Sequence, residues 1–283
     1  MDILVTGGNG FVGTALIKQL KSDGHTIVSI DDLSIGTVEN EIEGVRYIHD
    51  DANNIFAYDI PKVDYVFHLA GLSRIQPSFE EPTETFMANT VTSQVICDWA
   101  RLTGVKRLIY SGSSSKWHNP YTSPYATYKH LGEEICKMYK KSYDMDTQVV
   151  RFYNVYGPNE ITEGEWAAVI GKWRKQVEEG KLITIVGDGE QRRDFTHVDD
   201  IVDALIKVML TDHHVDDAWE LGTGENYSIN EVFEIFKEKF NVKSTYIPDQ
   251  EGNYRVTLRE KNEAVELLNW DPTDKLKDYI LSL

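Results

Sequence analysis

The stretch from Ser111 to Lys129 holds residue types that could carry out acid–base chemistry. Serines occupy positions 113 to 115, and Tyr125 comes four residues before Lys129 in a segment with a helical pattern. Residues four apart share one face of a helix, so this phenol and this ammonium can enter the same pocket. A neighbouring positive charge favours the phenolate, which would bring the pKa of Tyr125 toward neutrality from about 10. The spacing alone also fits an amphipathic helix whose lysine extends to solvent.

A glycine-rich turn near the N-terminus could deliver a ligand to this stretch. Gly7, Gly10 and Gly13 separate an apolar run at residues 3–5 from residues 11–20, where apolar residues recur at helical spacing. A dinucleotide diphosphate needs this order of strand, tight turn and helix N-terminus. The glycines let the backbone turn and approach the phosphates, and the free N–H groups of the helix meet the negative charge.

Two acidic residues end the next apolar run. Asp31 and Asp32 lie about 20 residues beyond the glycines, which is the spacing of a dinucleotide-binding βαβ unit. A carboxylate at this place can accept both ribose hydroxyls of NAD and would repel the extra phosphate of NADP. No arginine follows closely, so NAD is favoured as the cofactor. The alternative is that Asp31 only caps a turn.

Two further strand-like segments end in residues suited to a cofactor. Asp51 and Ala52 follow the first segment and could flank the adenine. Leu69, Ala70 and Gly71 follow the second and could line the underside of the cofactor, where small residues permit close approach.

Composition limits the other possibilities. The chain has 283 residues, of which 41% are hydrophobic, and therefore predicts one large domain or two smaller ones. No apolar run approaches the length of a membrane span, and the chain opens on a core-like strand, so we expect no signal peptide. The net charge of −17 argues against nucleic acid and anionic membranes as partners. Cys97 and Cys136 lack metal-ligand spacing, so we expect free thiols, a cytoplasmic protein and no metal.

Apolar strand-like and helical segments alternate along the first half of the chain, including a long helical segment that ends at Gly104. This alternation predicts an α/β fold, a Rossmann-type doubly wound parallel sheet with a smaller, interleaved C-terminal substrate-binding lobe. We expect residues 1–155 to form the cofactor-binding domain, with residues 183–215 returning to it in part. Residues 156–182 and 216–283 would form the smaller lobe.

Seven sequence motifs occur in order along nearly the whole chain. They are TGGNGFVG (6–13), HLAG (68–71), SGS (111–113), YATYK (125–129), RFYNVYGP (151–158), GDGEQRRDFTHVDD (187–200) and LGTGENYSINE (221–231). In these motifs the chain resembles the extended short-chain dehydrogenase/reductases, in particular the NAD-dependent nucleotide-sugar epimerases and dehydratases. The resemblance implies NAD in the N-terminal domain and a nucleoside-diphosphate sugar, with a UDP-sugar expected first, in the C-terminal lobe.

The resemblance also implies roles for individual residues. Tyr125 would be the catalytic base, Lys129 would bind the nicotinamide ribose and lower the pKa of the tyrosine, and Ser113 would hydrogen-bond the reacting hydroxyl. The residues implied to bind the cofactor are Gly7, Gly10, Phe11, Val12, Gly13, Asp31, Asp32, Asp51, Ala52, Leu69, Ala70, Gly71, Asn89, Ser111, Tyr125, Lys129 and Tyr153. Those implied to bind the substrate are Ser73, Ser113, Ser114, Tyr125, Asn154, Ala168, Val169, Arg193 and Arg255. Arg193 would hold the diphosphate, because a guanidinium suits bidentate phosphate binding.

The implied reaction is transient oxidation of the sugar at C4, followed by return of the hydride to the opposite face. A 4,6-dehydratase of this family additionally uses Asp and Glu directly after the active-site hydroxyl residue. Ser114 and Ser115 stand there and cannot do that acid–base work, so we expect a 4-epimerase. The alternatives are a 4,6-dehydratase, a keto-sugar reductase and, from another class, a non-catalytic NAD-binding regulatory protein.

The chain departs from the family pattern on the substrate side. The loop before Tyr125 is shortened to KWHNPYTSP, with Trp117 where the family has the aromatic residue of a VYG-like turn. Gln250 stands where a second phosphate-binding arginine is common, and Arg255 is the candidate substitute. The family commonly forms dimers through two helices, which correspond here to residues 84–103 and 125–142, so we expect a homodimer.

Overall fold

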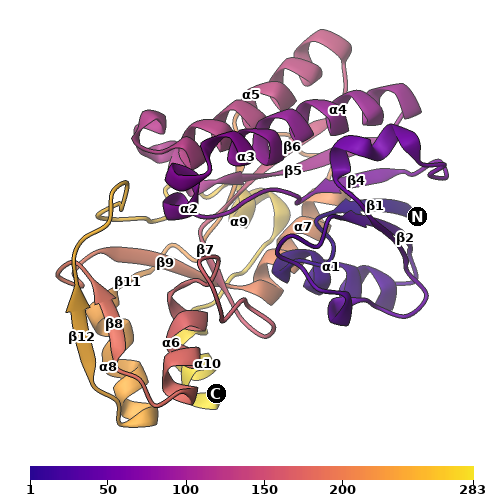
Figure 1. The fold of residues 1–283 in the computed structure, drawn as a ribbon. Coiled ribbons are helices and arrows are strands. Elements are labelled where there is room, and N and C mark those ends of the chain that lie inside the picture. Colours follow the sequence, from indigo (N-terminus) through magenta and orange to yellow (C-terminus); the bar gives the residue numbers. More distant parts are fainter.

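The chain folds around a seven-stranded sheet (Figure 1). The structure is a computed structural model that describes residues 1–283. The strands of the sheet are β1 (Asp2–Thr6), β2 (Thr26–Asp31), β3 (Arg46–His49), β4 (Tyr65–His68), β5 (Arg107–Ser113), β6 (Thr147–Phe152) and β10 (Trp219–Leu221). Their order is β10-β6-β5-β4-β1-β2-β3, and every neighbouring pair is parallel. The prediction of a doubly wound parallel sheet is therefore confirmed, with its switch point between β1 and β4.

Helices cover both faces of this sheet (Figure 1). One face is covered by α1 (Phe11–Ser22), α7 (Val198–Leu210) and α9 (Glu263–Leu268), and the other by α4 (Thr92–Thr103) and α5 (Pro124–Tyr143). Successive strand residues point to opposite faces. Ile3 and Val5 accordingly pack with α1 and α7, whereas Leu4 packs with α4 and α5. Burial on both faces explains why these strands are continuously apolar in sequence.

The long helical segment that ends at Gly104 contains a local change of helix type. It comprises α3 (Pro82–Phe86), a π-helical segment at Met87–Val91, and α4. The Thr92 hydroxyl donates to the Met87 carbonyl at 3.0 Å within this wider turn. Gly104 ends the helix with a φ of 71°, as its predicted role as a C-cap requires. A shorter helix, α2 (Ile75–Glu80), precedes α3.

A smaller lobe lies below the sheet in the view of Figure 1. Its strands are β7 (Asn154–Tyr156), β8 (Ile183–Val186), β9 (Arg192–His197), β11 (Asn226–Ser228) and β12 (Ser244–Ile247), and its helices are α6 (Val169–Glu178), α8 (Ile229–Phe240) and α10 (Leu276–Ser282). The strands form two small sheets, β11-β9-β7 and β12-β8. The core of the lobe is aromatic, with Trp173 and Phe236 in edge-to-face contact at 5.3 Å between ring centroids.

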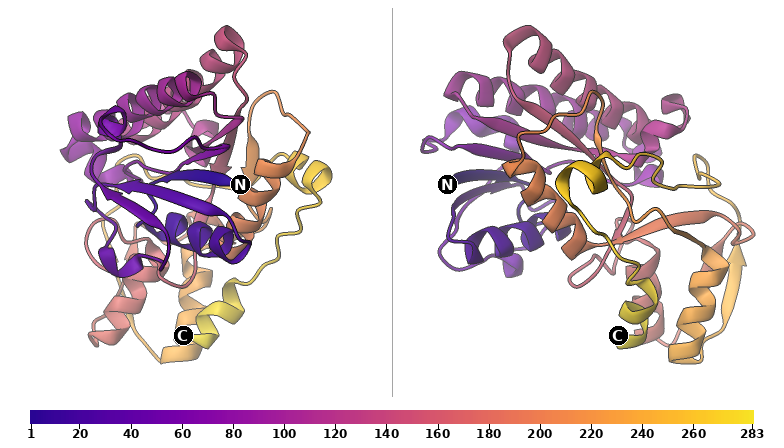
Figure 2. Two further views of the ribbon diagram at one scale, coloured as in Figure 1. Left: turned by 90° about the vertical axis from the view of Figure 1, so that its right-hand side faces the viewer. Right: turned by 180° about the vertical axis from the view of Figure 1, so that it is seen from behind.

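The chain passes between the two lobes several times (Figure 2). We expected residues 183–215 to return in part to the larger lobe. In the structure α7 packs on α1 in the larger lobe, whereas β8 pairs with β12 in the smaller lobe. Residues 216–283 were expected in the smaller lobe, but β10 is an edge strand of the large sheet and α9 packs on the core of that sheet. Trp219 and Leu221 are fully buried in this strand, which is too short to show a sequence periodicity. None of the helices combines the length and apolar character needed to cross a bilayer.

Candidate active site

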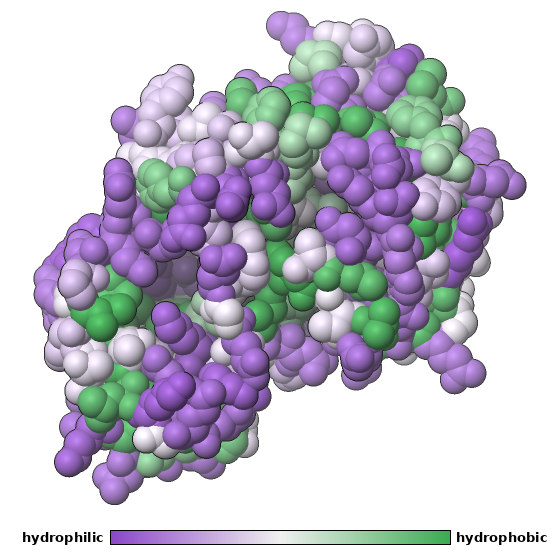
Figure 3. All heavy atoms as spheres, viewed as in Figure 1, coloured by the Kyte–Doolittle hydropathy of each residue, from purple (hydrophilic) through white to green (hydrophobic).

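A cavity of about 800 Å³ lies between the carboxyl ends of the large sheet and the smaller lobe. The face of the molecule in Figure 3 is hollowed between the two lobes, with polar and apolar residues around the hollow. Most of the predicted site residues line this one cavity. They are Gly7, Gly10, Phe11, Val12, Gly13, Asp31, Asp32, Asp51, Ala52, Leu69, Ala70, Gly71, Ser73, Ser111, Ser113, Ser114, Tyr125, Lys129, Tyr153, Asn154, Ala168, Val169 and Arg193.

The glycine turn at the end of β1 fits a dinucleotide diphosphate. Gly7 has a φ of 75°, and a β-carbon there would lie 2.7 Å from the backbone nitrogen of Ala70. A β-carbon on Gly13 would collide with the Gly7 carbonyl oxygen. A β-carbon on Gly10, in contrast, would make only an ordinary contact with the Gly7 carbonyl oxygen at 3.4 Å, and Gly10 caps α1 without any side-chain hydrogen bond. The first N–H groups of α1 are therefore available to phosphate oxygens.

The acidic residue at the end of β2 is held in place by the backbone. The Asp31 carboxylate is buried and accepts hydrogen bonds from the Asn9 and Leu33 amides, each at 2.9 Å. Each oxygen keeps a second lone pair for a ribose hydroxyl. Burial raises the pKa of Asp31 above its ordinary value, although the two backbone hydrogen bonds act in the opposite direction. Asp32 and Asp51 also line the cavity, and each accepts a hydrogen bond from the backbone two residues further on.

The catalytic candidates meet where β5 and α5 approach each other. Ser123 caps α5 by accepting a hydrogen bond from the Ala126 amide at 3.1 Å, which fixes the first turn of the helix. This turn carries Tyr125, whose hydroxyl donates to the Ser113 hydroxyl at 3.3 Å. Because Ser113 is the last residue of β5, the strand end and the helix start bring the two hydroxyls together at the cavity wall.

Lys129 lies one turn further along α5 and points back toward β5. Its ammonium donates to the Ser111 carbonyl at 3.0 Å, and burial lowers its pKa to about 8. Burial raises the pKa of Tyr125 above its ordinary value, although the Ser113 hydroxyl and the Arg74 guanidinium act in the opposite direction. The sequence predicted that Lys129 would lower the pKa of Tyr125. In the structure the Lys129 ammonium donates to the Ser111 carbonyl, and the Arg74 guanidinium acts to lower the pKa of Tyr125.

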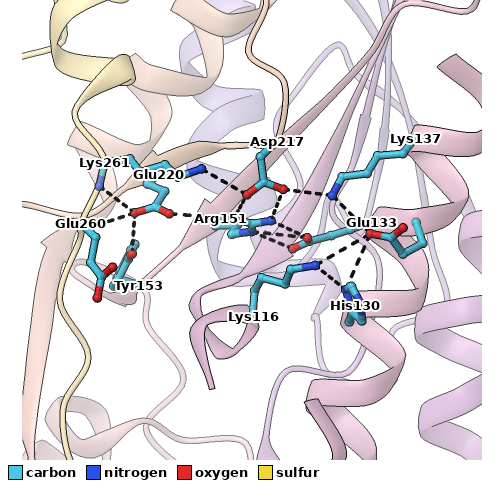
Figure 4. Close-up of polar contacts among 11 residues, drawn as sticks. Lys116, His130, Glu133, Lys137, Arg151, Tyr153, Asp217, Glu220, Glu260 and Lys261 are labelled. Atoms are coloured by element: carbon cyan, nitrogen blue, oxygen red, sulfur yellow. Dashed lines mark hydrogen bonds and ion pairs between the residues drawn. The ribbon is translucent and has the colours of Figure 1, made fainter. Parts of the chain in front are cut away.

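A buried ionic network holds the middle of α5 against the sheet (Figure 4). Arg151 on β6 is fully buried and donates to Glu133 on α5 at 2.8 Å and to Asp217 at 2.7 Å. Glu220 on β10 lies 3.8 Å from the same guanidinium and accepts a hydrogen bond from the Tyr153 hydroxyl at 2.9 Å. The network therefore connects the helix that carries Tyr125 and Lys129 to the cavity-lining Tyr153.

The shortened loop before Tyr125 packs on this network. It forms two short 3₁₀ turns, at Ser114–Trp117 and Pro120–Thr122. The Trp117 ring centroid lies 5.6 Å from the Arg151 guanidinium and 5.3 Å from the Lys261 ammonium. Two cations so close to the indole ring anchor the loop.

On the smaller lobe, Arg193 and Asn154 line the cavity. Arg193 donates to the Asn253 side-chain oxygen and to the Arg192 carbonyl, and burial lowers its pKa to about 10. It forms no ion pair, so its remaining donors can meet an anionic ligand. The Asn154 amide group donates to the Asp194 carbonyl at 3.0 Å and to the Thr257 hydroxyl at 3.1 Å.

Two predicted site residues do not line the cavity. Arg255 was expected to bind substrate, but its exposed guanidinium pairs with Asp188 at 2.8 Å, away from the cavity wall. Asn89 was expected to bind the cofactor, but it lies buried behind Gly71, and its amide group donates to the Leu72 carbonyl at 3.0 Å. Asn89 therefore supports the loop that lines the cavity.

Among the cavity residues that were not predicted, three carry polar groups that could meet a ligand. Arg74 and Glu160 bring charges into the cavity, and Tyr254 brings a phenol. The Tyr254 hydroxyl is buried without a hydrogen-bond partner, and its ring stacks on His118 at 3.8 Å between centroids. Only Arg74 carried a usable sequence signal, since it closely follows β4 at the edge of the sheet where ligands bind.

Known proteins share this sequence pattern and this fold. Residues 3–222 match the family model described as "NAD dependent epimerase/dehydratase family". The chain is 30% identical to the UDP-glucose 4-epimerase of Mycolicibacterium smegmatis, over 99% of this chain and 96% of that protein. It is 29% identical to the UDP-glucuronate 4-epimerase of Thermodesulfobacterium geofontis, over 97% and 92%. The solved structure of the Thermotoga maritima UDP-glucose 4-epimerase with UDP-glucose has a TM-score of 0.91 at 29% identity, over 99% and 96%. The chain therefore belongs to the NAD-dependent epimerase/dehydratase family, which names the cofactor that the glycine turn and Asp31 predicted.

Proposed function

We propose that the protein is an NAD-dependent enzyme that epimerises the sugar of a UDP-sugar at C4. The observation that carries the proposal is the 3.3 Å contact between the Tyr125 and Ser113 hydroxyls, next to Lys129 in the cavity wall. A tyrosine so placed can exchange a proton with a sugar hydroxyl held at the end of β5. The relatives that act on UDP-glucose and UDP-glucuronate support the same reaction class.

The cofactor would lie along the carboxyl ends of β1, β2 and β4. The first N–H groups of α1, beyond Gly10, would hold its diphosphate, and Asp31 would accept its adenosine ribose hydroxyls. Lys129 would donate to the nicotinamide ribose. When bound, NAD supplies a reversible acceptor for the hydride that leaves C4 and returns to it.

Tyr125 would act first as a base and then as an acid. Ser113 would orient the C4 hydroxyl by a hydrogen bond while Tyr125 takes its proton, leaving a ketone at C4. The sugar then turns within the cavity to present its other face, and Tyr125 returns the proton to the C4 oxygen as the C–H bond forms again. The nearby cationic groups, Lys129 and Arg74, stabilise the phenolate that this cycle requires.

The residues after Ser113 favour epimerisation over dehydration. Removing water across C5 and C6 needs an acid and a base near those carbons, and Ser114 and Ser115 supply only hydroxyls. A non-catalytic NAD-binding protein would have no need to bring Ser113, Tyr125 and Lys129 together around one cavity.

Product analysis tests this proposal. The protein with NAD is incubated with UDP-glucose or UDP-glucuronate, and the products are followed by proton NMR. We expect two C4 epimers to equilibrate without net NADH, and Tyr125→Phe to lower kcat about 1000-fold. A stable keto-sugar product, or a requirement for added NADPH, would contradict the proposal.

We also infer a cytoplasmic homodimer. Leu102 on α4 and Leu131 and Met138 on α5 are exposed apolar residues, which supports association through these two helices. Cys97 and Cys136 are unbonded thiols with their sulfurs 3.8 Å apart, as suits a reducing compartment. Light scattering should give twice the chain mass of 32.4 kDa.

A further inference from the structure

Arg74 is a cavity-lining arginine without a counter-ion. It lies between the cofactor-lining residues that follow β4 and the first turn of α2. Its guanidinium makes one hydrogen bond, from Nε to the Trp166 carbonyl at 2.9 Å, and it forms no ion pair with a carboxylate. A guanidinium has five N–H donors. The donors that remain are therefore available to a ligand, and burial makes their neutralisation favourable.

The acidic side chain that influences the pKa of Arg74 does not fill this role. Glu160 lines the same cavity and acts to raise the pKa of Arg74. Its carboxylate, however, is paired with Arg174 at 3.6 Å and accepts a hydrogen bond from the Tyr279 hydroxyl at 3.4 Å. The protein thus supplies Arg174 with a partner and leaves Arg74 without one.

The position of Arg74 relates it to the sugar. The Arg74 and Tyr125 side chains both line the cavity, where Arg74 acts to lower the pKa of Tyr125 and Tyr125 acts to raise the pKa of Arg74. They are also linked structurally, because Ser78 in α2 accepts a hydrogen bond from the Tyr125 backbone amide at 3.1 Å. The proposed reaction places C4 of the sugar at the Tyr125 hydroxyl. C6 is attached to C5, the ring carbon next to C4, so a charged group on C6 would come close to the same phenol.

Arg193 is the second unpaired arginine in the cavity, and its neighbours are different. It contacts Asn253 and is influenced by Tyr254 and Asp249 from the C-terminal third of the chain. It is therefore the candidate for the diphosphate. A UDP-sugar with a neutral sugar has no second anion to match Arg74.

We propose that Arg74 binds a carboxylate at C6 of the sugar, so that the substrate class is a UDP-uronic acid. This inference rests on the proposed epimerase function, because that function places the sugar beside Tyr125. A carboxylate can pair with the guanidinium through two parallel hydrogen bonds. A neutral hydroxymethyl group would leave the guanidinium desolvated and unpaired, which disfavours the neutral sugar.

Binding measurements can test the inference apart from turnover. Tyr125→Phe protein saturated with NAD is titrated with UDP-glucuronate and with UDP-glucose by calorimetry. We expect UDP-glucuronate to bind about 100-fold more tightly, and Arg74→Gln to reduce this ratio to near one. Arg193→Gln is the matched control, since it should weaken both ligands and leave their ratio unchanged.

Other outcomes would overturn the inference. If Arg74 binds the diphosphate, Arg74→Gln weakens both sugars and free UDP by the same factor. If UDP-glucose binds as tightly as UDP-glucuronate, Arg74 has no role in selecting the sugar. Arg74→Lys guards against a folding defect, because it keeps the charge and should retain part of the preference while losing the bidentate geometry.

The proposed function can fail separately. Turnover of wild-type protein is measured by NMR on the same two ligands. If UDP-glucuronate is preferred in binding through Arg74 but neither sugar is epimerised, the reaction assignment fails and the recognition of a carboxylate stands. If UDP-glucose is epimerised at least as well as UDP-glucuronate, the reaction assignment stands and the uronic acid inference fails.

Discussion

Arg151 and Arg74 are two internal arginines that differ in their partners, because only Arg151 is paired with carboxylates. Arg151 is surrounded by Glu133, Asp217 and Glu220 (Figure 4), and it does not line the cavity. Arg74 lines the cavity and has a single backbone carbonyl as its partner. The first joins elements of the fold, and the second is available to a ligand. Carboxylates thus surround the internal arginine that holds the fold together and are absent from the partly buried arginine that faces the cavity.

The charge of Arg151 is compensated by the carboxylates of Glu133 and Asp217, and Asp217 also pairs with Lys137. Burial acts to lower the pKa of Arg151, but its hydrogen bonds with Glu133 and Asp217 raise that pKa above its ordinary value. Burial likewise acts to raise the pKa of Asp217, and the hydrogen bonds from Arg151 and Lys137 bring it well below its ordinary value. Arg151 and Asp217 therefore stay ionised as a pair, and removing the guanidinium would leave buried carboxylates without a cation.

The largest effect is expected from Arg151→Gln. This substitution leaves Glu133 and Glu220 buried without a cation, which costs about 3–5 kcal/mol. Thermal unfolding followed by circular dichroism should show a Tm about 10 °C lower. The control is Arg101→Gln, which breaks a half-exposed pair with Asp98 and should cost no more than about 1 kcal/mol. Equal effects at the two positions would show that the buried network does not stabilise the fold.

A smaller effect is expected at Glu160, an acid that lines the same cavity as Arg74. Burial raises its pKa from 4.5 to about 7, against the opposing contributions of Arg174 and Tyr279. The folded state thus binds this proton more tightly than the unfolded state does. The stabilisation from this proton is complete below the pKa of the unfolded state, 4.5, and is lost as the pH rises through the pKa of the folded state, about 7.

Glu160→Gln should therefore raise the Tm relative to wild type more at pH 8 than at pH 5. The difference corresponds to at most about 3 kcal/mol. Glu163→Gln is the control, because this exposed glutamate three residues away should give the same small effect at both pH values. A Glu160→Gln effect that does not change with pH would mean that the carboxylate is already ionised in the folded protein at pH 5.

The smallest change in stability is expected from Arg74→Gln, the same substitution as at Arg151. No carboxylate loses its partner, and an unpaired cation is removed. The free energy of unfolding should stay within about 1 kcal/mol of wild type or rise slightly, as at other sites where function opposes stability. The measurement is the change in Tm from wild type for Arg74→Gln and for Arg151→Gln, obtained under the same conditions. A loss at Arg74 as large as that at Arg151 would reveal an internal role for Arg74.

The cofactor side of the site was largely predictable from the sequence, because its residues follow directly from local structure. Gly7 and Gly10 lie in the turn after β1, and Asp31 is the last residue of β2. The carboxyl ends of parallel strands lie at the same edge of the sheet, and this placement does not depend on the conformation of the loops. Tyr125 and Ser113 were predictable for the same reason, since one starts a helix and the other ends a strand.

The substrate side depends on contacts that no local pattern contains. Arg255 was predicted to substitute for the arginine that is missing at position 250, but its guanidinium pairs with Asp188 outside the cavity. Glu160 comes from an irregular segment whose position is set by packing against α6 and α10. Tyr125 shows the same limit in its electrostatics. Its spacing to Lys129 places both residues at the cavity, yet burial raises its pKa against the opposing effects of the Ser113 hydroxyl and Arg74.

The fate of the hydrogen at C4 tests the central claim most directly. A UDP-sugar that carries deuterium at C4 is incubated with the protein and NAD in ordinary water, and the product is examined by NMR and mass spectrometry. Transient oxidation by Tyr125 and NAD predicts that the C4 epimer keeps its deuterium at C4, and that turnover is slower than with the protonated sugar. Loss of the deuterium to solvent, or inversion at another carbon, would contradict the account.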